Sequence, residues 1–207
     1  EVYHVQGGKK IRLSRPQQLM AAEREIIEEA YAGDIIGVFD PGIFSIGDTL
    51  CAPGKKFKFD PIPTFAPEHF RRVRSLDTMK RKQFLKGMEQ IAQEGAIQIF
   101  KTPYTGMEEV IVGVVGTLQF DVLEYRLKNE YNVELYMEGL PYEYLRWITT
   151  DDGEPVKEED LILGTDVKLV EDYKGNQLLL FGSQWAVGWT QERNPNLTFH
   201  EFGGTRF

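Results

Sequence analysis

The chain has 207 residues, of which 42% are hydrophobic and 27% charged, and this ordinary globular balance excludes extensive disorder. No stretch reaches the roughly 18 uninterrupted apolar residues that a membrane-spanning helix needs, so we expect no membrane partner. The formal net charge of −8 argues against a surface covered with nucleic-acid contacts, although it allows a local basic patch.

The cysteine content and the first residues indicate the compartment. The single cysteine, Cys51, cannot form an internal disulfide, which favours a reducing compartment and excludes a Cys-rich zinc site. Residues 1–4 have neither the basic leader nor the apolar block of a secretory signal. We therefore expect a cytoplasmic protein, and the lack of an initiator methionine suggests a fragment of something longer.

Residues 1–63 contain short apolar runs separated by Gly and Pro turn signals. The runs cover residues 2–5, 11–13, 34–39 and 46–50. Their close spacing predicts a small antiparallel β-barrel or sandwich. Residues 17–30 have helical propensity, yet a strand–loop–strand arrangement is equally compatible with them, and both alternatives stay open.

The hydrophobic period changes in residues 64–149, where two amphipathic helices are expected. The first covers 79–94, with Asp77 as N-cap and Gly95 as the C-terminal stop. The second covers 118–129, with Thr117 as its cap. The residues expected to face the core are Phe84, Leu85, Met88, Ile91 and Ala92 in the first helix, and Leu118, Val122, Leu123 and Leu127 in the second.

Strands are expected around these helices, and their order predicts the fold. The expected strands cover residues 70–74, 96–100, 110–115, 133–137 and 144–148. The first four give the order β-α-β-β-α-β, so we predict a ferredoxin-like domain of the α+β class, with both helices on one face of an antiparallel sheet.

Residues 150–207 are expected to form an acidic linker and a packed C-terminal extension of this domain. Between residues 150 and 175 there are nine Asp or Glu against three Lys, which is typical of a solvated face. The apolar residues at 178–181 predict a strand. Two tryptophans, at 185 and 189, lie close to two phenylalanines, at 181 and 199, which indicates that the last segment packs.

Signatures of catalysis are not evident in the sequence. The Gly-Lys pairs at 8–9 and 54–55 are not followed by Ser or Thr, so neither is a P-loop. We therefore expect no catalytic, cofactor-binding or metal-binding residue in this chain. A hydrolase built from Asp or Glu carboxylates and His69 is a weaker alternative.

The strongest electrostatic feature is a basic segment between Phe70 and Gly87, where seven cations meet one carboxylate, that of Asp77, for a net charge of +6 (seven minus one). Its cations are Arg71, Arg72, Arg74, Lys80, Arg81, Lys82 and Lys86. Such a patch can neutralise phosphates. A solvated face is the simpler interpretation from the residues alone, and docking of the acidic residues 150–175 onto the patch is a third.

A glycine pair, Gly113 and Gly116, lies between an expected strand and an expected helix. This position raises the hypothesis of a phosphate cradle or KH-type loop. A tight strand-to-helix turn, which the fold needs there in any case, is the favoured interpretation. An RNA-recognition motif has the same topology, but residues 112–115 lack its stacking aromatics.

Residues 29–37 (EAYAGDIIG) and 46–49 (IGDT) are similar to the second-domain barrel of translational GTPases. Further characteristic segments are 65–74, 85–87, 94–100, 112–122 (VGVVGTLQFDV), 125–134 and 191–195, with Trp147. Together these segments resemble one known family, that of bacterial peptide chain release factor 3, a class II release factor among the translational GTPases. The resemblance is poor at residues 150–188.

The resemblance implies the C-terminal part of such a factor, lacking the GTPase domain. Because the chain would begin inside the barrel, residues 1–63 would form a partial antiparallel β-barrel of the second-domain type. GTP and magnesium would then bind only in that domain of the parent protein. In the family, GTP drives removal of class I release factors from the ribosome after peptide release. The implied partners are therefore the ribosome (rRNA and small-subunit proteins), class I release factors indirectly, and the chain's own GTPase domain.

On this resemblance the seven cations become candidates for ribosome contact. A stand-alone ferredoxin-like module that binds a ligand or a protein is the alternative function. An incomplete barrel also leaves unpaired strand edges. We therefore expect either poor order in the first ~40 residues or a dimer formed through an exposed barrel edge.

Overall fold

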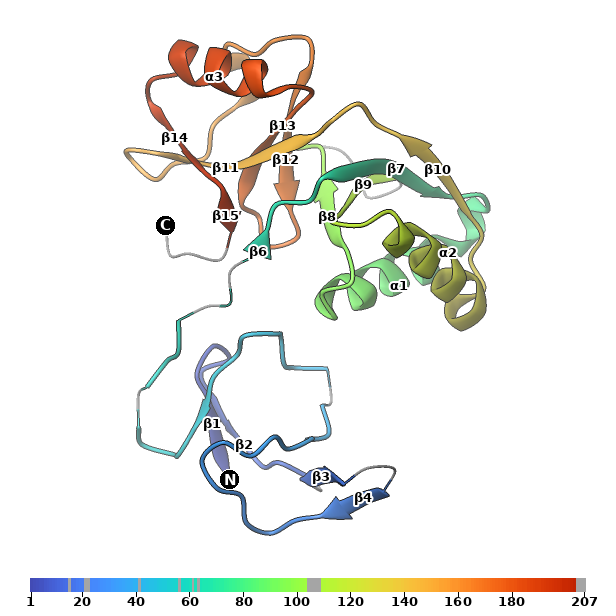
Figure 1. Cartoon of the computed structure of the whole chain (residues 1–207), viewed down its shortest axis with the longest axis vertical. Helices are drawn as coiled ribbons and strands as arrows, with labels where there is room; N and C mark the ends of the chain where they lie inside the picture. The colour runs from blue at the N-terminus through green and yellow to red at the C-terminus, as the bar shows by residue number, and fades with distance from the viewer. Residues whose placement is uncertain are drawn as a thin grey trace. The chain divides into compact units, whose positions relative to one another are not determined.

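The computed structural model describes residues 1–14, 16–20, 23–40, 42–55, 57–60, 62, 64–103 and 109–203, without the side chains of 18–20, 23–25, 109 and 203 (Figure 1). The chain divides into two compact units, Glu1–Ile62 and Pro63–Phe207, which are described separately. The division into 1–63, 64–149 and 150–207 stays a prediction.

The first unit is built from short antiparallel strands. A three-stranded sheet has the order β2-β1-β5, and a separate hairpin joins β3 to β4. The strands are β1 (Val2–His4), β2 (Lys9–Ile11), β3 (Gln17–Met20), β4 (Glu23–Ile26) and β5 (Leu50–Cys51). Strand–loop–strand is therefore the correct alternative for residues 17–30. The strand content agrees with the predicted antiparallel barrel; disorder and dimerisation stay predictions.

A buried histidine connects the beginning of this unit to the turn before β5. The Nε2 atom of His4 lies 2.7 Å from Oδ2 of Asp48, which also accepts a hydrogen bond of 2.9 Å from the Ser45 backbone N–H. The Phe44 ring meets the imidazole edge-on, with 5.3 Å between centroids. These contacts fix the turn that leads into β5.

The second unit contains an eight-stranded antiparallel sheet of order β10-β7-β9-β8-β12-β13-β11-β14. Its first half consists of β7 (His69–Ser75), α1 (Arg81–Gln93), β8 (Gln98–Lys101), β9 (Glu109–Val114), α2 (Leu118–Tyr131) and β10 (Leu135–Gly139). Numbered along the chain, these strands lie in the order 4-1-3-2, which is the ferredoxin-like arrangement. The predicted α+β class and β-α-β-β-α-β order are thus confirmed.

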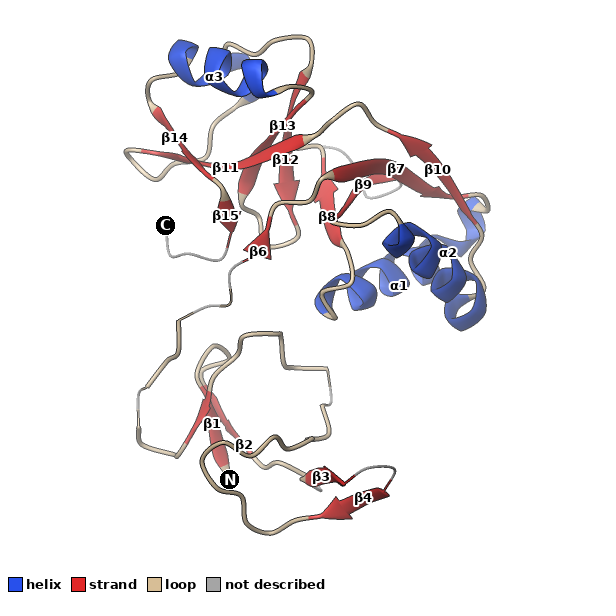
Figure 2. Cartoon of the chain, in the orientation of Figure 1, coloured by secondary structure: helices blue, strands red, loops and turns tan. Residues whose placement is uncertain are grey.

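The C-terminal strands continue the same sheet. They are β11 (Tyr144–Thr150), β12 (Val167–Asp172), β13 (Gln177–Phe181) and β14 (Leu197–His200), with α3 (Gln184–Arg193) between the last two (Figure 2). The two halves join where β12 pairs with β8, with Glu171 opposite Lys101. Two 3-10 turns, η1 (Thr78–Lys80) and η2 (Glu158–Asp160), and the short pair β6 (Thr64–Phe65) and β15 (Phe202–Gly203) complete the unit.

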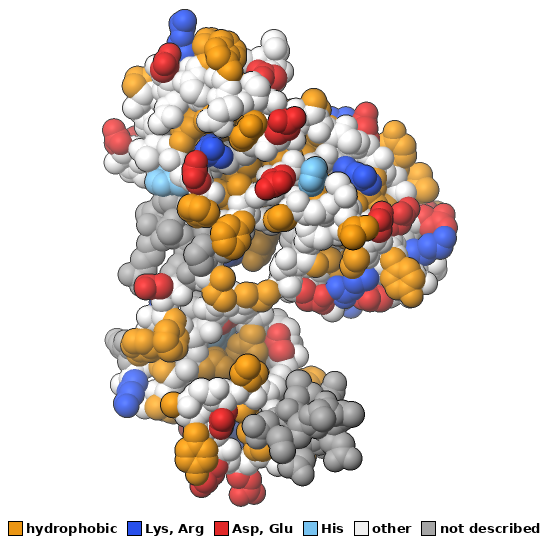
Figure 3. Space-filling view, viewed as in Figure 1, with side chains coloured by type: hydrophobic (Ala, Val, Ile, Leu, Met, Phe, Trp, Pro, Cys, Tyr) orange, Lys and Arg blue, Asp and Glu red, His pale blue; other side chains and the backbone are white. Residues whose placement is uncertain are grey.

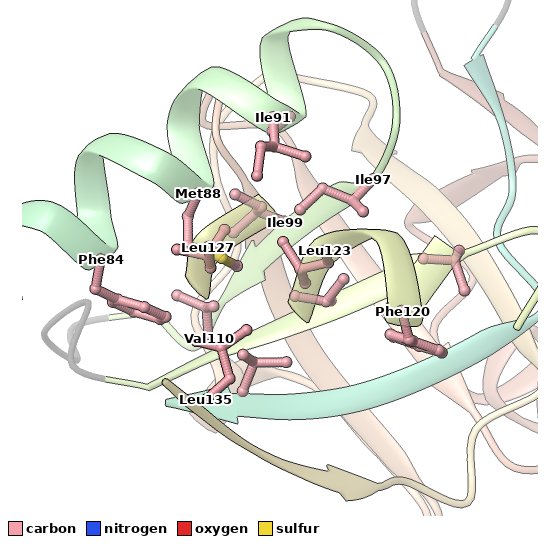
Figure 4. Packing of buried hydrophobic residues seen from close by; sticks show 14 of the residues in the cluster. Phe84, Met88, Ile91, Ile97, Ile99, Val110, Phe120, Leu123, Leu127 and Leu135 are labelled. Atoms are coloured by element: carbon pink, nitrogen blue, oxygen red, sulfur yellow. The ribbon is translucent and has the colours of Figure 1, made fainter. Parts of the chain in front are cut away.

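One hydrophobic core lies between α1, α2 and one face of the ferredoxin-like half (Figure 4). The face predicted for the first helix is confirmed, since Phe84, Met88, Ile91 and Ala92 are buried and Leu85 packs against the cluster. Asp77 accepts a hydrogen bond from the Met79 backbone N–H, so it caps η1, the turn that precedes α1.

The face predicted for the second helix is partly wrong. Leu118 and Val122 are 75% and 49% exposed, whereas Phe120 joins Leu123 and Leu127 in the core. The stripe 120–123–127 has the i, i+3, i+7 spacing of a single helix face, and it buries an aromatic ring, which removes more apolar surface from water than Leu118 would. The expected Thr117 side-chain cap does not form.

A second core lies on the sheet face opposite α1 and α2. Phe70, Phe100 and Ile111 meet buried side chains of the C-terminal strands there: Leu145, Trp147, Val170, Leu178 and Leu180. The buried apolar residues of α1, α2 and α3 belong to the other two clusters. The sheet face opposite α1 and α2 is therefore covered by residues of strands and loops.

The third core lies between α3 and the C-terminal strands, where Ala186, Val187 and Leu197 are buried. Figure 1 shows α3 over this half of the sheet and α1 with α2 over the other. The last segment therefore packs, as predicted. In the described part of the chain, no helix is both long and apolar enough to cross a membrane.

Candidate nucleic-acid interface

The three arginines of β7 point to two sides of the sheet, because successive residues of a strand face opposite ways. Arg71 is on the same side as the core residue Val73, and its Cζ lies 4.3 Å from the centre of the Phe120 ring of α2. Arg72 and Arg74 are on the side of Phe70, away from the helices. Arg71 therefore stabilises helix packing through a cation–π contact.

Arg72 and Arg74 form one surface with the neighbouring strand. In the register of β10 and β7, Tyr136 lies opposite Arg74 and Glu138 opposite Arg72. The Cζ of Arg74 is 4.6 Å from the centre of the Tyr136 ring, and Nη1 of Arg72 is 3.3 Å from a Glu138 carboxylate oxygen. We call these four residues the Arg–Tyr surface; all of them are at least partly open to solvent.

The remaining cations lie on η1 and α1. Lys80 donates a hydrogen bond of 2.7 Å to the backbone carbonyl of Asn132, the left-handed residue that ends α2. An ammonium group at a helix C-terminus is favourable because unpaired carbonyls gather there. Arg81, Lys82 and Lys86 are exposed, and Lys82 and Lys86 are one helical turn apart.

The seven cations therefore occupy separate places, and the single patch expected from the sequence is divided. The reason is strand alternation, which sends Arg71 to the helix side. On the face drawn in Figure 3, Lys and Arg side chains over the α1–α2 half are interspersed with Asp and Glu. In the acidic residues 150–175, Glu171 pairs with Lys101 and Glu159 with Lys157.

The glycine turn between β9 and α2 has a structural role. A Cβ atom on Gly113 would lie 2.6 Å from Pro67 and 2.8 Å from Phe100, so the position needs glycine. The backbone N–H groups of Val115 and Gly116, which a phosphate cradle would use, donate to the side-chain oxygen of Gln119 at 3.0 and 2.9 Å. The N–H groups that a phosphate would need are thus already hydrogen-bonded to a side chain of α2.

An arginine on α2 holds the end of α1 in place. Arg126 donates two hydrogen bonds to Glu130, of 2.8 and 2.9 Å, and its Nη1 also contacts Glu94, which follows α1. The hydrogen bonds from Arg126 lower the pKa of both carboxyl groups, and the two carboxylates raise the pKa of Arg126. We call these three residues the Arg126 clasp.

Two observations on the described residues concern metal ligands and the histidine of the hydrolase alternative. Within them, no group of three or more His, Cys, Asp or Glu side chains could hold a metal ion. His69, which the hydrolase alternative requires, is exposed at the beginning of β7 opposite Val114.

Sequence reasoning missed two aromatic residues beside the arginines. Phe120 lies under Arg71, and Tyr136 lies beside Arg74. Alternation in the expected strand 133–137 places Tyr136 on the side opposite Leu135. However, only the strand register reveals that its neighbour is Arg74.

Comparison with known proteins defines the class. Residues 1–53 match the family model of elongation factor G domain 2, and residues 59–191 match that of the class II release factor RF3, C-terminal domain. A translation-factor second domain followed by a release-factor domain is the architecture of a translation factor.

Curated relatives specify the family. The chain is 51% identical over 199 residues to peptide chain release factor 3 of Symbiobacterium thermophilum, covering 96% of this chain and 37% of the relative. It is 46% identical over 200 residues to that of Gloeobacter violaceus (97% and 37%), and 44% identical over 190 residues to that of Listeria welshimeri (92% and 35%). The chain belongs to the class II release factor 3 family, as its sequence resemblance predicted, and spans little more than a third of these relatives.

Proposed function

We propose that this chain is the ribosome-binding part of a release factor 3 and acts in translation termination. The observation that carries the proposal is family membership across nearly the whole chain, with 51% identity over 96% of its length. Hydrolysis of GTP, with its magnesium, would belong to the part of the factor that this chain does not span. The proposed place of action is the cytoplasm.

The proposed mechanism is positional. The chain holds basic side chains against rRNA and small-subunit proteins while a separate GTPase domain drives removal of class I release factors. Two surfaces are candidates for phosphate contact: the Arg–Tyr surface with Arg72 and Arg74, and the outer face of α1 with Lys82 and Lys86. Arg71 and Lys80 are assigned to internal packing, because each already contacts α2 or its end.

Ribosome pelleting over a salt series tests this proposal. We expect the 207-residue chain to bind salt-sensitively, because each neutralised phosphate releases counterions. Each lost contact should reduce the slope of log K against log salt by about 0.7 to 0.9. Replacing Arg72 and Arg74 together with Ala, or Lys82 and Lys86 together with Ala, removes two cations from one surface at a time.

A matched control removes two cations from the acidic stretch, by Lys157→Ala with Lys174→Ala. This double variant should pellet like the unaltered chain. Absence of pelleting by the unaltered chain at low salt would contradict the proposal. Equal loss in the control would show that binding follows net charge rather than these surfaces.

A further inference from the structure

We propose that the Arg–Tyr surface binds an unpaired nucleobase of RNA. The base stacks on the Arg74 guanidinium, which itself lies over Tyr136, and Arg72 faces the adjoining phosphate. This inference rests on the proposed ribosome-binding function and adds the kind of RNA that the surface takes: single-stranded or looped rather than duplex.

The location follows from what the C-terminal strands cover. Four-stranded sheets of this topology can stack bases on the face opposite their helices. Here the middle of that face is closed, because Phe70, Phe100 and Ile111 are buried in the second core. At the edge of the sheet, where β10 pairs with β7, Tyr136 is 44% exposed and Arg74 is also exposed.

The geometry suits stacking. With its Cζ 4.6 Å from the centre of the Tyr136 ring, Arg74 presents one side to the aromatic ring. Arg74 is also exposed, so its side chain can be reached from solvent. A planar guanidinium held by a ring is pre-organised for a base, so little side-chain freedom is lost on binding. Tyr136 and Arg74 also face each other in register, which fixes the pair on the sheet.

Two cations of this surface, Arg72 and Arg74, can face an RNA backbone next to the stacked base, while Glu109 lies opposite Arg74 in β9. Arg72 contributes a second cation, and its contact with Glu138 is a half-exposed ion pair of 3.3 Å. Pairs of this kind contribute little stability, so a phosphate can replace the carboxylate at low cost. A duplex stacks its bases internally and offers no free base face, whereas a loop or single strand does.

The test uses two fluorescent probes with the whole chain at low salt: an unstructured ten-nucleotide RNA and an RNA duplex of equal charge. We expect tighter binding of the single strand. Tyr136→Ala removes the ring that holds the Arg74 guanidinium in place, so it should weaken this binding by about 2-fold to 5-fold, the size of one exposed cation–π contact. Tyr136→Phe should retain binding. Arg74→Lys should weaken it while the salt slope stays unchanged, since the charge remains.

Tyr125→Ala is the matched control, because Tyr125 is an exposed tyrosine on α2 and its loss should have no effect. Equal affinity for duplex and single strand, or binding unchanged in Tyr136→Ala, would overturn the inference. If ribosome pelleting persists in that case, the proposed function stands. RNA binding that follows the expected variants without any pelleting would instead contradict the proposed function.

Discussion

Gly87 lies on the face of α1 that packs against α2. A Cβ atom there would be 2.9 Å from Cδ1 of the buried Leu127 and 3.0 Å from the Tyr131 ring. Alanine improves helix propensity by about 1 kcal/mol, but overpacking a core costs about 1 to 3 kcal/mol. We expect Gly87→Ala to lower the free energy of unfolding by roughly 1 kcal/mol, measured by urea titration with tryptophan fluorescence.

Gly188 on α3 supplies the matched control. It is exposed, and a Cβ there would meet no atom within 4 Å. Gly188→Ala should therefore stabilise the protein by about 0.5 to 1 kcal/mol through helix propensity alone. If both variants were stabilised, the close approach of the two helices at Gly87 would be relieved more easily than the distances indicate.

At the level of elements, the Arg126 clasp fixes the end of α1 against α2. Its two carboxyl groups have lowered pKa values in the folded protein. Their contribution to stability is therefore complete above the unfolded carboxyl pKa and is lost as the pH falls through the lower folded values. Arg126→Gln should lower the urea midpoint at pH 7, and this difference should shrink below about pH 4.5.

Lys128→Gln on the same helix is the control for this prediction. Lys128 pairs with Glu134 at 3.4 Å, with both side chains 63% exposed, and such pairs contribute little. Its urea midpoint should therefore differ little from that of the unaltered chain. A pH-independent deficit in Arg126→Gln would instead indicate that Arg126 acts through packing of its side chain.

The local hydrophobic pattern of the sequence was sufficient to predict the helices and strands of the ferredoxin-like half. It did not predict which side of α2 faces the core or which residues pair across strands. The stripe of α1 is unambiguous because its apolar residues lie on one face only. In α2, apolar residues such as Leu118 and Phe120 lie on two faces, so the choice depends on tertiary packing. The pairing of Arg74 with Tyr136, and of β12 with β8, joins segments far apart in the chain and depends on register.

At the level of the whole molecule, the two units differ in how much apolar surface they bury. The buried hydrophobic side chains of the described residues lie between Phe70 and Leu197, all within the second unit. In the described part of the first unit, the buried side chains are His4 and Thr49, while Ile35, Phe39 and Phe59 are exposed. Since apolar burial is the main stabilising contribution, the first unit is expected to be the weaker one.

This difference predicts two unfolding steps in urea. All three tryptophans, Trp147, Trp185 and Trp189, lie in the second unit, so their fluorescence reports that unit alone. We expect amide exchange in β1 and β2 to become fast at urea concentrations where the fluorescence is still native, while β7 and β9 stay protected. Coincident loss of protection in β1 and of native fluorescence would contradict this order, because it would require the sparse core of the first unit to be as stable as the three cores of the second.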